Sequence, residues 1–336
     1  MFLSVIVPTQ NRARLLDPML ASLLTQTYPD SQFEVIVVDN GSSDDTQAVC
    51  SNYAEKITNF RTIYAPAPGL HVGRHTGLYA AKGDILVYAD DDIVALPTWL
   101  EGIYESFLNR PEVALVGGKN NPDFETPPPL WVKQLWSEHN GQRSCALFSI
   151  VDLGDDILEV SPFVVWGCNF SIRKSVLLRI GGFNPDGMPK DWMQYRGDGE
   201  SAVCRGVLSL GYKTLYNPKA SVNHFVSTQR MTFDYLYERG IRSGVSASYF
   251  RIRTQGKLPF WHAYFLFKAT FSTWIAWTKT GLKDQKKQVL KAYQSGFLAG
   301  YWFHVNAVKK DPELLKWVLK ECYLDPPTPS QRTLDD

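Results

Sequence analysis

Three consecutive aspartates, Asp90 to Asp92, are the residues whose type and spacing most directly suggest chemistry. They follow an apolar run, Ile85 to Ala89, and apolar residues resume after them. Adjacent carboxylates repel one another and are costly to remove from water unless a positive charge offsets them. Mg²⁺ and Mn²⁺ take oxygen ligands, commonly one or two carboxylates together with substrate phosphates. The triplet therefore predicts either a metal site that holds a diphosphate or a solvated acidic turn without chemistry.

The elements that would position the triplet alternate between strands and helices. Runs that are apolar throughout predict strands at residues 2–9, 35–38 and 85–89, as in a parallel sheet buried on both faces. Leucines at helical spacing lie between the first two runs, and this alternation is typical of α/β folds. Ligands in such sheets bind at the carboxyl ends of the strands, where Thr9, Asp39 and the triplet lie.

Composition narrows the class of protein. The 336 residues suffice for one large domain with a helical extension, and 44% hydrophobic with 21% charged residues is typical of a folded chain. A net charge of +1 gives no whole-chain basis for nucleic acid binding. None of the five cysteines forms a CxxC pair, which favours a cytoplasmic compartment. We interpret the apolar start as a strand rather than a signal peptide, and no run reaches the roughly 18 apolar residues of a membrane span.

Five further segments occur in a fixed order: "SVIVPTQNR", "VIVVDNGSSDDT", "AAKGDILVYADDD", "NFSIRKSVLLRIGGFN" and "GYKTLYNPKASVNH". Together they resemble the family 2 glycosyltransferases, inverting enzymes of GT-A fold that use nucleotide sugars, over about residues 3–225. The resemblance implies a Rossmann-like, mostly parallel central sheet flanked by helices, and metal-dependent transfer of a sugar to a hydroxyl group. A UDP-sugar donor, a glycan or lipid-linked acceptor, and a place in polysaccharide biosynthesis are expected on the same ground.

The resemblance also implies roles for residues around the donor. Thr9 and Asp39 would contact the base and ribose, and Asn11 and Arg12 on the loop after the first strand would reach the phosphates. Arg74 fills the place of an Arg- and Asn-containing segment of the family and would bind the diphosphate or the sugar. Asp39 could instead cap the next helix. Arg12 and Arg74 could be exposed surface charges.

Within the triplet, the resemblance implies that Asp90 or Asp91 faces the ribose or the metal. Asp90 and Asp92 are the expected carboxylate ligands of Mn²⁺ or Mg²⁺, with Asp92 the best single candidate. His224 follows a strand at the place where the family often supplies a further metal ligand. A lone histidine can equally be structural.

The catalytic base is expected in "RGDGESAVCR". Inverting transfer needs one general base for the acceptor hydroxyl, and the family usually supplies it from a Glu-Asp pair followed by an arginine. Counting back from Arg205 places Asp198 on the usual Glu and Gly199 on the usual Asp, with Glu200 one residue further. The base is therefore Asp198 or Glu200, or the stretch is a capping loop without chemistry. We prefer Asp198, because a glycine on each side suggests close approach by a ligand, while Glu200 would favour the helix start.

The residues that could bind the acceptor lie in the later part of the chain. Trp166, Asp191 and Trp192 could form a platform for a sugar acceptor, although a tryptophan is more often part of the core. Arginines among aromatic residues follow on a predicted helix, and residues 258–277 form an amphipathic, aromatic segment. That segment could meet a membrane-bound, lipid-linked acceptor. Packing onto the catalytic part, or a homodimer contact, explains the same residues, and we favour packing.

The predicted division is a catalytic domain at 1–225, with a nucleotide-sugar half at 1–95 and an acceptor half at 96–225, then a helical extension at 226–322 and a disordered tail at 323–336. We expect a cytoplasmic protein, peripheral at the inner face of the membrane. A catalytically silent sugar-nucleotide- or glycan-binding protein of the same fold is the first alternative. A sugar-1-phosphate nucleotidyltransferase or a dinucleotide-dependent oxidoreductase would need a glycine-rich loop after the first strand, and "PTQNRARLL" has none.

Overall fold

A computed structural model describes residues 1–139, 141–256 and 285–324 of the chain. Its main element is a mixed eight-stranded sheet in which β1, β2, β3 and β4 run parallel and β12 runs antiparallel beside β4. In spatial order the strands are β11 (Leu158–Glu159), β13 (Lys213–Tyr216), β6 (Val113–Gly117), β12 (Asn169–Arg173), β4 (Ile85–Ala89), β1 (Leu3–Thr9), β2 (Phe33–Asp39) and β3 (Phe60–Tyr64).

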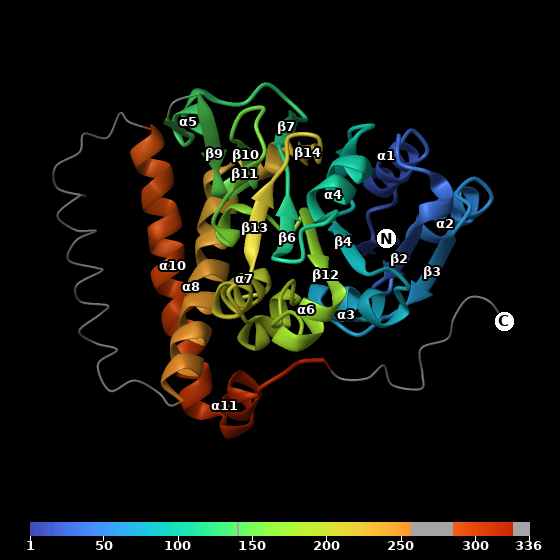
Figure 1. The fold of residues 1–336 in the computed structure, drawn as a ribbon. Helices are drawn as coiled ribbons and strands as arrows, with labels where there is room; N and C mark the ends of the chain where they lie inside the picture. The colour runs from blue at the N-terminus through green and yellow to red at the C-terminus, as the bar shows by residue number, and fades with distance from the viewer. Residues whose placement is uncertain (140, 257–284, 325–336) are drawn as a thin grey trace.

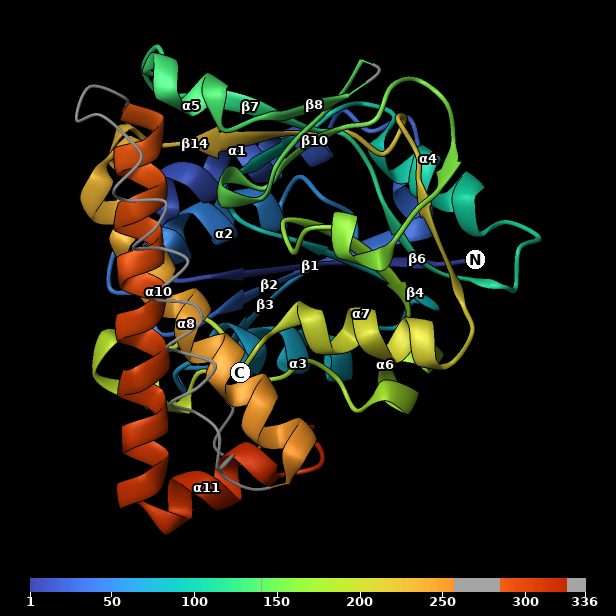
Figure 2. The ribbon, with the colours of Figure 1, turned by 90° about the vertical axis from the view of Figure 1, so that its left-hand side faces the viewer.

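Helices cover both faces of this sheet (Figures 1 and 2). On one face lie α1 (Ala13–Leu23), α2 (Thr46–Ala54) and α4 (Trp99–Phe107), and on the other lie α3 (Leu70–Ala80), α6 (Lys174–Ile180) and α7 (Glu200–Ser209). Alternate residues of β1 enter the two cores, Val5 and Val7 on one side and Ile6 on the other. This two-sided burial explains why the strands are apolar throughout.

A second, six-stranded sheet lies beside the first and brings the later part of the chain to the aspartates. Its spatial order is β5 (Ile93–Ala95), β14 (Val222–Val226), β7 (Asn120–Phe124), β10 (Ile150–Asp152), β9 (Gln142–Cys145) and β8 (Ser137–His139). β14 pairs antiparallel with β5, so that His224 lies opposite Ile93, the residue after the triplet. The short elements nearby are η1 (Asp30–Gln32), α5 (Leu130–Gln134), η2 (Ala146–Phe148), η3 (Pro162–Val164) and η4 (Lys190–Tyr195).

The later helices pack on this α/β part. After η5 (Thr228–Met231), α8 (Phe233–Gln255) and α10 (Gln285–Lys310) lie side by side (Figures 1 and 2), and α11 (Pro312–Leu319) contacts α8 and η4. Gly240 and Gly244 of α8 face the backbone of α10, and Gly296 and Gly300 of α10 face that of α8. Glycines permit this close approach because a Cβ atom there would collide with carbonyl oxygens of the other helix.

The C-terminal residues of the described chain bind back to the fold. Arg253 donates hydrogen bonds to the carbonyl groups of Val318, Lys320 and Glu321. Tyr323, the first residue of the predicted tail, is buried, and its hydroxyl accepts a hydrogen bond from Tyr249. Residues 325–336 of the predicted tail, and the amphipathic segment at 258–277, lie outside the described residues.

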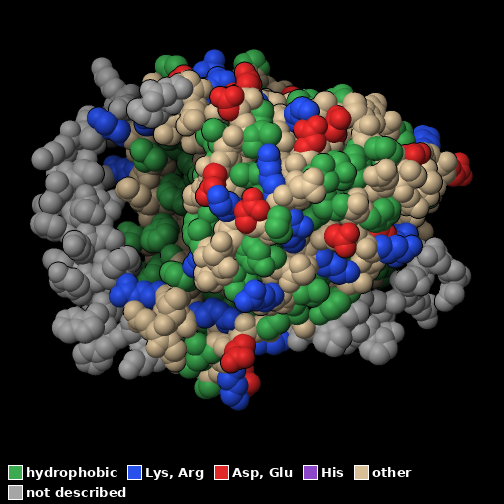
Figure 3. Space-filling model, viewed as in Figure 1, with side chains coloured by type: hydrophobic (Ala, Val, Ile, Leu, Met, Phe, Trp, Pro, Cys, Tyr) green, Lys and Arg blue, Asp and Glu red, His purple; other side chains and the backbone are tan. Residues whose placement is uncertain are grey.

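Figure 3 shows acidic and basic side chains interspersed over the face that it presents. In the described ranges, no helix is long and apolar enough to cross a bilayer.

Candidate active site

The predicted donor residues meet at the carboxyl ends of three neighbouring strands. Thr9 ends β1 and pairs in register with Asp39, which ends β2, while the aspartate triplet directly follows β4. A cleft of about 340 Å³ opens there. Its lining residues are Pro8, Thr9, Gln10, Arg12, Asn40, Pro66, Pro68, Gly69, Leu70, Asp90, Asp91, Gly187 and Pro189. The cleft is where a parallel sheet is expected to bind its ligand.

Two of the three aspartates are buried and share one arginine. The side chains of Asp91 and Asp92 are 3% and 5% exposed. Arg12 spans them, with Nη1 at 2.7 Å from Asp91 Oδ1 and Nη2 at 2.7 Å from Asp92 Oδ2. Thr9 Oγ1 donates to the other oxygen of Asp91 at 2.7 Å. In the protein alone, a guanidinium therefore supplies part of the offsetting charge that the triplet requires.

The environments of these two carboxyl groups push their pKa values in opposite directions. Burial raises the pKa of Asp91 to about 7, against the charge of Arg12 and the hydrogen bond from Thr9. Burial acts to raise the pKa of Asp92 as well, but the charges of Arg12 and Arg230 hold it below its usual range. Asp92 is therefore the carboxyl group of this pair that stays ionised, as a metal ligand must.

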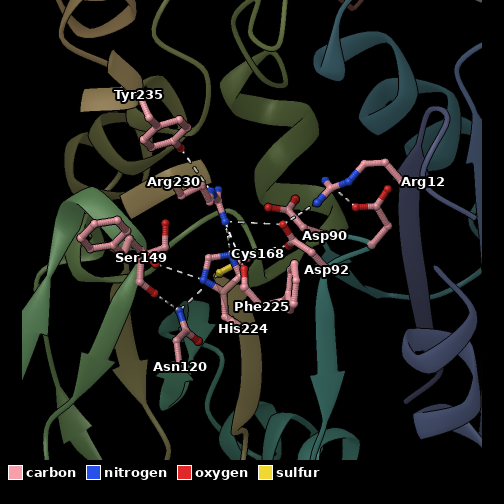
Figure 4. A network of polar contacts seen from close by, with 12 residues as sticks. Arg12, Asp90, Asp92, Asn120, Ser149, Cys168, His224, Phe225, Arg230 and Tyr235 are labelled. Carbon is pink, nitrogen blue, oxygen red and sulfur yellow. Dashed lines mark hydrogen bonds and ion pairs between the residues drawn. The ribbon is translucent and has the colours of Figure 1, made fainter. Parts of the chain in front are cut away.

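His224 and Arg230 approach Asp92 from the side opposite Arg12 (Figure 4). His224 Nδ1 lies 3.0 Å from the carbonyl oxygen of Phe148, which can only accept a hydrogen bond, so the proton is on Nδ1. The other ring nitrogen, Nε2, then presents a lone pair 3.5 Å from Asp92 Oδ1. Arg230 Nη1 lies 3.3 Å from His224 Nε2 and 3.6 Å from Asp92 Oδ2.

The buried pair formed by Asp92 and His224 fits a divalent cation. Within the parts of the chain that the structure describes, Asp92 Oδ1 is buried and has no hydrogen-bond partner, an arrangement that usually has a reason such as an ion. An oxygen and an imidazole nitrogen side by side are suitable ligands for Mn²⁺. No group of three or more His, Cys, Asp or Glu side chains in the described ranges is gathered to hold an ion by itself. Further ligands would have to come from movement of Asp90, from donor phosphates or from water.

Arg74 connects the triplet to the predicted base region. It is buried on α3, with Nη2 at 3.8 Å from Asp90 Oδ1 and Nη1 at 3.4 Å from Glu200 Oε2, and its guanidinium lies over the ring of Phe183. An added Cβ on Gly167 would collide with Arg74 Nη2. Arg74 is therefore part of the packed interior and not an exposed surface charge.

The two carboxylates considered as base have different surroundings. Asp198 is 6% exposed, forms an ion pair with Arg205, and accepts a hydrogen bond from Asn184 Nδ2 at 2.7 Å. Glu200 begins α7, is 28% exposed, and has one long contact, to Arg74. Glu200 thus has the more accessible carboxylate and lies on the side of the triplet.

The remaining predicted residues are placed as follows. Asp39 is buried and accepts a hydrogen bond from Ser42 N–H at 2.8 Å. Asn11 adopts φ 53° and accepts a hydrogen bond from Ser43 N–H, which joins the loops after β1 and β2. Neither side chain lines the cleft; each holds the backbone of the loop after β2, beside it.

The acceptor residues lie in different environments. Trp166 packs partly buried against the core, whereas Asp191 and Trp192 are exposed on η4. Next to them, Lys190 and Met193 line a second hollow of about 700 Å³ that is bounded by α8 and α10.

The family model described as "Glycosyl transferase family 2" matches residues 4–181, just over half of the chain. The chain belongs to glycosyl transferase family 2. It is an enzyme of glycosyl transfer, of the hexosyltransferase type, as the sequence predicted.

Three of the relatives found are named as glycosyltransferases of stated organisms. Glucosyl-dolichyl phosphate glucuronosyltransferase of Haloferax volcanii is 26% identical over 251 residues, which cover 73% of this chain and 76% of the relative. Glycosyltransferase AglE of the same organism is 32% identical, with 48% of this chain and 56% of the relative covered. Validoxylamine A glucosyltransferase of Streptomyces hygroscopicus subsp. jinggangensis is 27% identical, with 55% and 47% covered. This family 2 enzyme spans about half the length of the last two relatives.

Solved structures confirm the GT-A fold. Mannosyltransferase PcManGT from Pyrobaculum calidifontis, solved with GDP-Man and Mn²⁺, has a TM-score of 0.53 and 20% identity, covering 96% of this chain and 84% of that chain. S. aureus TarS 1-349, solved with UDP-GlcNAc, has a TM-score of 0.50 and 14% identity, with 92% of each chain covered. At these identities the similarity is one of fold.

Arg230 was missed as a site residue by the sequence reasoning, which treated it only as one of several basic residues on a helix. The available signal was its place six residues after His224, just beyond a predicted strand end.

Proposed function

We propose that this protein is a metal-dependent, inverting glycosyltransferase that moves a sugar from a nucleoside diphosphate donor to a hydroxyl of a glycan or a lipid-linked acceptor. The observation that carries the proposal is the buried pair of Asp92 Oδ1 and His224 Nε2, with Glu200 on the same side of the triplet. A UDP-sugar is the preferred donor. Supporting facts are family membership, a relative named for glucosyl-dolichyl phosphate, and neighbours in fold solved with UDP-GlcNAc or GDP-Man.

In this proposal Thr9 and Asp39 bind the base and ribose, and Arg12 and Asn11 adjoin the phosphates. Asp92 and His224, with Asp90, hold Mn²⁺ or Mg²⁺. When bound, that ion would neutralise charge on the departing diphosphate. Asp198 and Glu200 both lie at the start of α7, and we assign the role of general base to Glu200.

Glu200 accepts the proton of the acceptor hydroxyl as that oxygen attacks the anomeric carbon. Arg74 is buried and always charged, and its contact with the Glu200 carboxylate at 3.4 Å orients that side chain. Attack from the face opposite the diphosphate inverts the anomeric centre, so an α-linked donor gives a β-linked product. Asp198 has a positioning role, because Arg205 and Asn184 already occupy its oxygens.

The proposed division is a catalytic domain at 1–225 with the nucleotide-sugar half at 1–95, followed by a helical extension at 226–322. Peripheral contact with a membrane and a homodimer through the C-terminal helices stay predictions. Sedimentation of the protein alone and with liposomes tests both.

The donor proposal is tested by a thermal-shift and donor-hydrolysis panel. UDP-, GDP- and dTDP-sugars are each offered with Mn²⁺, Mg²⁺ or EDTA. We expect one nucleotide to raise Tm and to be hydrolysed only with metal. Asp155→Ala is the matched control for Asp92→Ala, because Asp155 is exposed and pairs with Lys119, and neither residue lines the cleft. Failure of every nucleotide to bind, with or without metal, would leave the triplet an acidic turn and end the proposal.

A further inference from the structure

Arg230 is a cation beside the aspartate triplet that comes from the C-terminal part of the chain. It lies on η5, between β14 and α8, and reaches Asp92 from the side opposite Arg12 (Figure 4). Its Nε donates to Tyr235 Oη at 3.1 Å, and its Nη1 donates to the carbonyl oxygen of Phe225 at 3.2 Å. These two contacts fix the plane of the guanidinium.

A role as counter-ion of Asp92 accounts for only part of this arrangement. Asp92 Oδ2 already has Arg12 Nη2 at 2.7 Å, whereas Arg230 Nη1 is 3.6 Å away. The same Nη1 faces the lone pair of His224 at 3.3 Å. Within the described residues, Nη2 of Arg230 has no hydrogen-bond partner, so two N–H donors remain for a ligand.

The charges around the triplet favour an anion next to Arg230. Four carboxylates, those of the triplet and Glu200, are paired with three guanidiniums, those of Arg12, Arg74 and Arg230. A divalent cation bound between Asp92 and His224 would lie beside the guanidinium of Arg230, and two such positive charges repel one another. A diphosphate that enters with the cation offsets both positive charges and gives Arg230 an acceptor.

We propose that Arg230 binds the terminal phosphate of the nucleoside diphosphate, the one that carries the sugar, and that Tyr235 positions it. This deepens the proposed function and rests on it. Thr9 lines the cleft and donates to Asp91, and Arg12 reaches Asp91 and Asp92 from the cleft. Arg230 approaches Asp92 from the opposite side, so a phosphate bound by Arg230 would lie beyond one that adjoins Arg12.

The consequence is that the helical extension completes the donor site. Tyr235 lies in the first turn of α8, where its N–H is held by the side chain of Thr232 at 3.2 Å. The placement of α8 therefore sets the placement of Arg230.

The test measures binding and needs no acceptor. Dissociation constants for UDP and UMP, and for GDP and GMP, are measured by calorimetry with Mn²⁺ on the full-length wild type, Arg230→Met, Arg230→Lys and Tyr235→Phe. Arg242→Met is the matched control: Arg242 stacks on the same Tyr235 ring and pairs with Glu238, but has no described contact with the aspartates.

We expect Arg230→Met to weaken binding of the diphosphate about 10- to 100-fold, the range for a hydrogen bond to a charged group. Binding of the monophosphate should change less than about twofold, since it lacks the terminal phosphate. Arg230→Lys should recover part of the loss, and Tyr235→Phe should show a smaller loss. The control should bind both ligands as the wild type does.

An unchanged diphosphate affinity in Arg230→Met would make Arg230 a counter-ion of Asp92 and overturn the inference. Equal losses for diphosphate and monophosphate would also overturn it, because they would indicate a distorted cleft. If Arg230→Met does not fold, the Arg230→Lys and Tyr235→Phe variants decide by the same comparison. If the wild type binds no diphosphate with Mn²⁺, the proposed function fails first, and this inference with it.

Discussion

Replacing Glu200 and Asp198 one at a time should separate chemistry from stability. Glu200→Gln keeps the size of the side chain and removes the charge that would accept a proton. Its loss as general base is expected to lower kcat about 10²- to 10⁴-fold. The side chain is partly exposed and its one described ion pair is long, at 3.4 Å to Arg74. The free energy of unfolding should therefore change by less than about 1 kcal/mol.

Asp198→Asn should show the reverse pattern. Asp198 is buried, and the substitution removes the charge that pairs with Arg205 and leaves an NH2 group facing one of the two donors, Arg205 or Asn184. Disrupting hydrogen bonds to charged groups of this kind costs about 2–3 kcal/mol. A chain of 336 residues has an unfolding entropy of about 0.7 kcal/mol/K, so Tm should fall by about 3–4 °C.

The assay pairs thermal unfolding, followed by circular dichroism, with the initial rate of transfer at saturating donor. Glu200→Gln should unfold as the wild type does and turn over slowly, with donor affinity retained. Asp198→Asn should unfold early and keep most of its turnover at low temperature. An Asp198→Asn variant that unfolds normally but has lost more than about 100-fold in kcat, beside an active Glu200→Gln, would refute the assignment.

Three further expectations follow from the same contacts. Asp92→Ala should abolish the rise in Tm that nucleotide and Mn²⁺ produce together; a metal-dependent rise that survives in this variant would contradict the ligand assignment. Gly244→Ala should destabilise the fold by about 2 kcal/mol, because the added Cβ would collide with the carbonyl oxygen of Phe297 where α8 meets α10. An unchanged midpoint of denaturant unfolding would contradict that packing. Burial lowers the pKa of His304 to about 4 from 6.5, so as pH falls the unfolded chain takes up the proton before the folded chain does. About 3 kcal/mol of the free energy of unfolding is therefore lost between pH 6.5 and 4. His304→Met should reduce this loss in urea titrations at pH 7 and 4.5, and an unchanged loss would contradict the expectation.

Local pattern was enough to predict the sheet and its binding edge. β1, β2 and β4 are buried on both faces, so each is a continuous apolar run that the sequence shows directly. The residue after each run lies at the carboxyl edge of the sheet. Resemblance added His224, whose approach to Asp92 depends on a pairing between strands far apart in sequence, β14 with β5. Phe225 N–H donates to Asp92 O at 2.8 Å as part of that join.

Long-range packing is what the sequence could not supply. The preference for Asp198 rested on its flanking glycines, taken as a sign of close approach by a ligand. In the fold, Gly199 adopts φ +49° and an added Cβ would meet Asp186, while Gly197 is approached by Pro185 and Tyr249. These glycines accommodate the protein's own side chains. The turn at Gly199 leaves Asp198 in its ion pair with Arg205, while Glu200 contacts Arg74 at the start of α7.

The charges of the three consecutive aspartates are offset before any donor is bound. Three arginines from separate segments offset them: Arg12 after β1, Arg74 on α3, and Arg230 on η5. Removing one member of such a buried pair leaves its partner uncompensated, so carboxylates and guanidiniums hold each other in place. A donor diphosphate with its cation would then exchange one set of ion pairs for another of similar net charge. The site can therefore be organised in advance for a charged ligand, and Arg230 makes the helical extension part of that organisation.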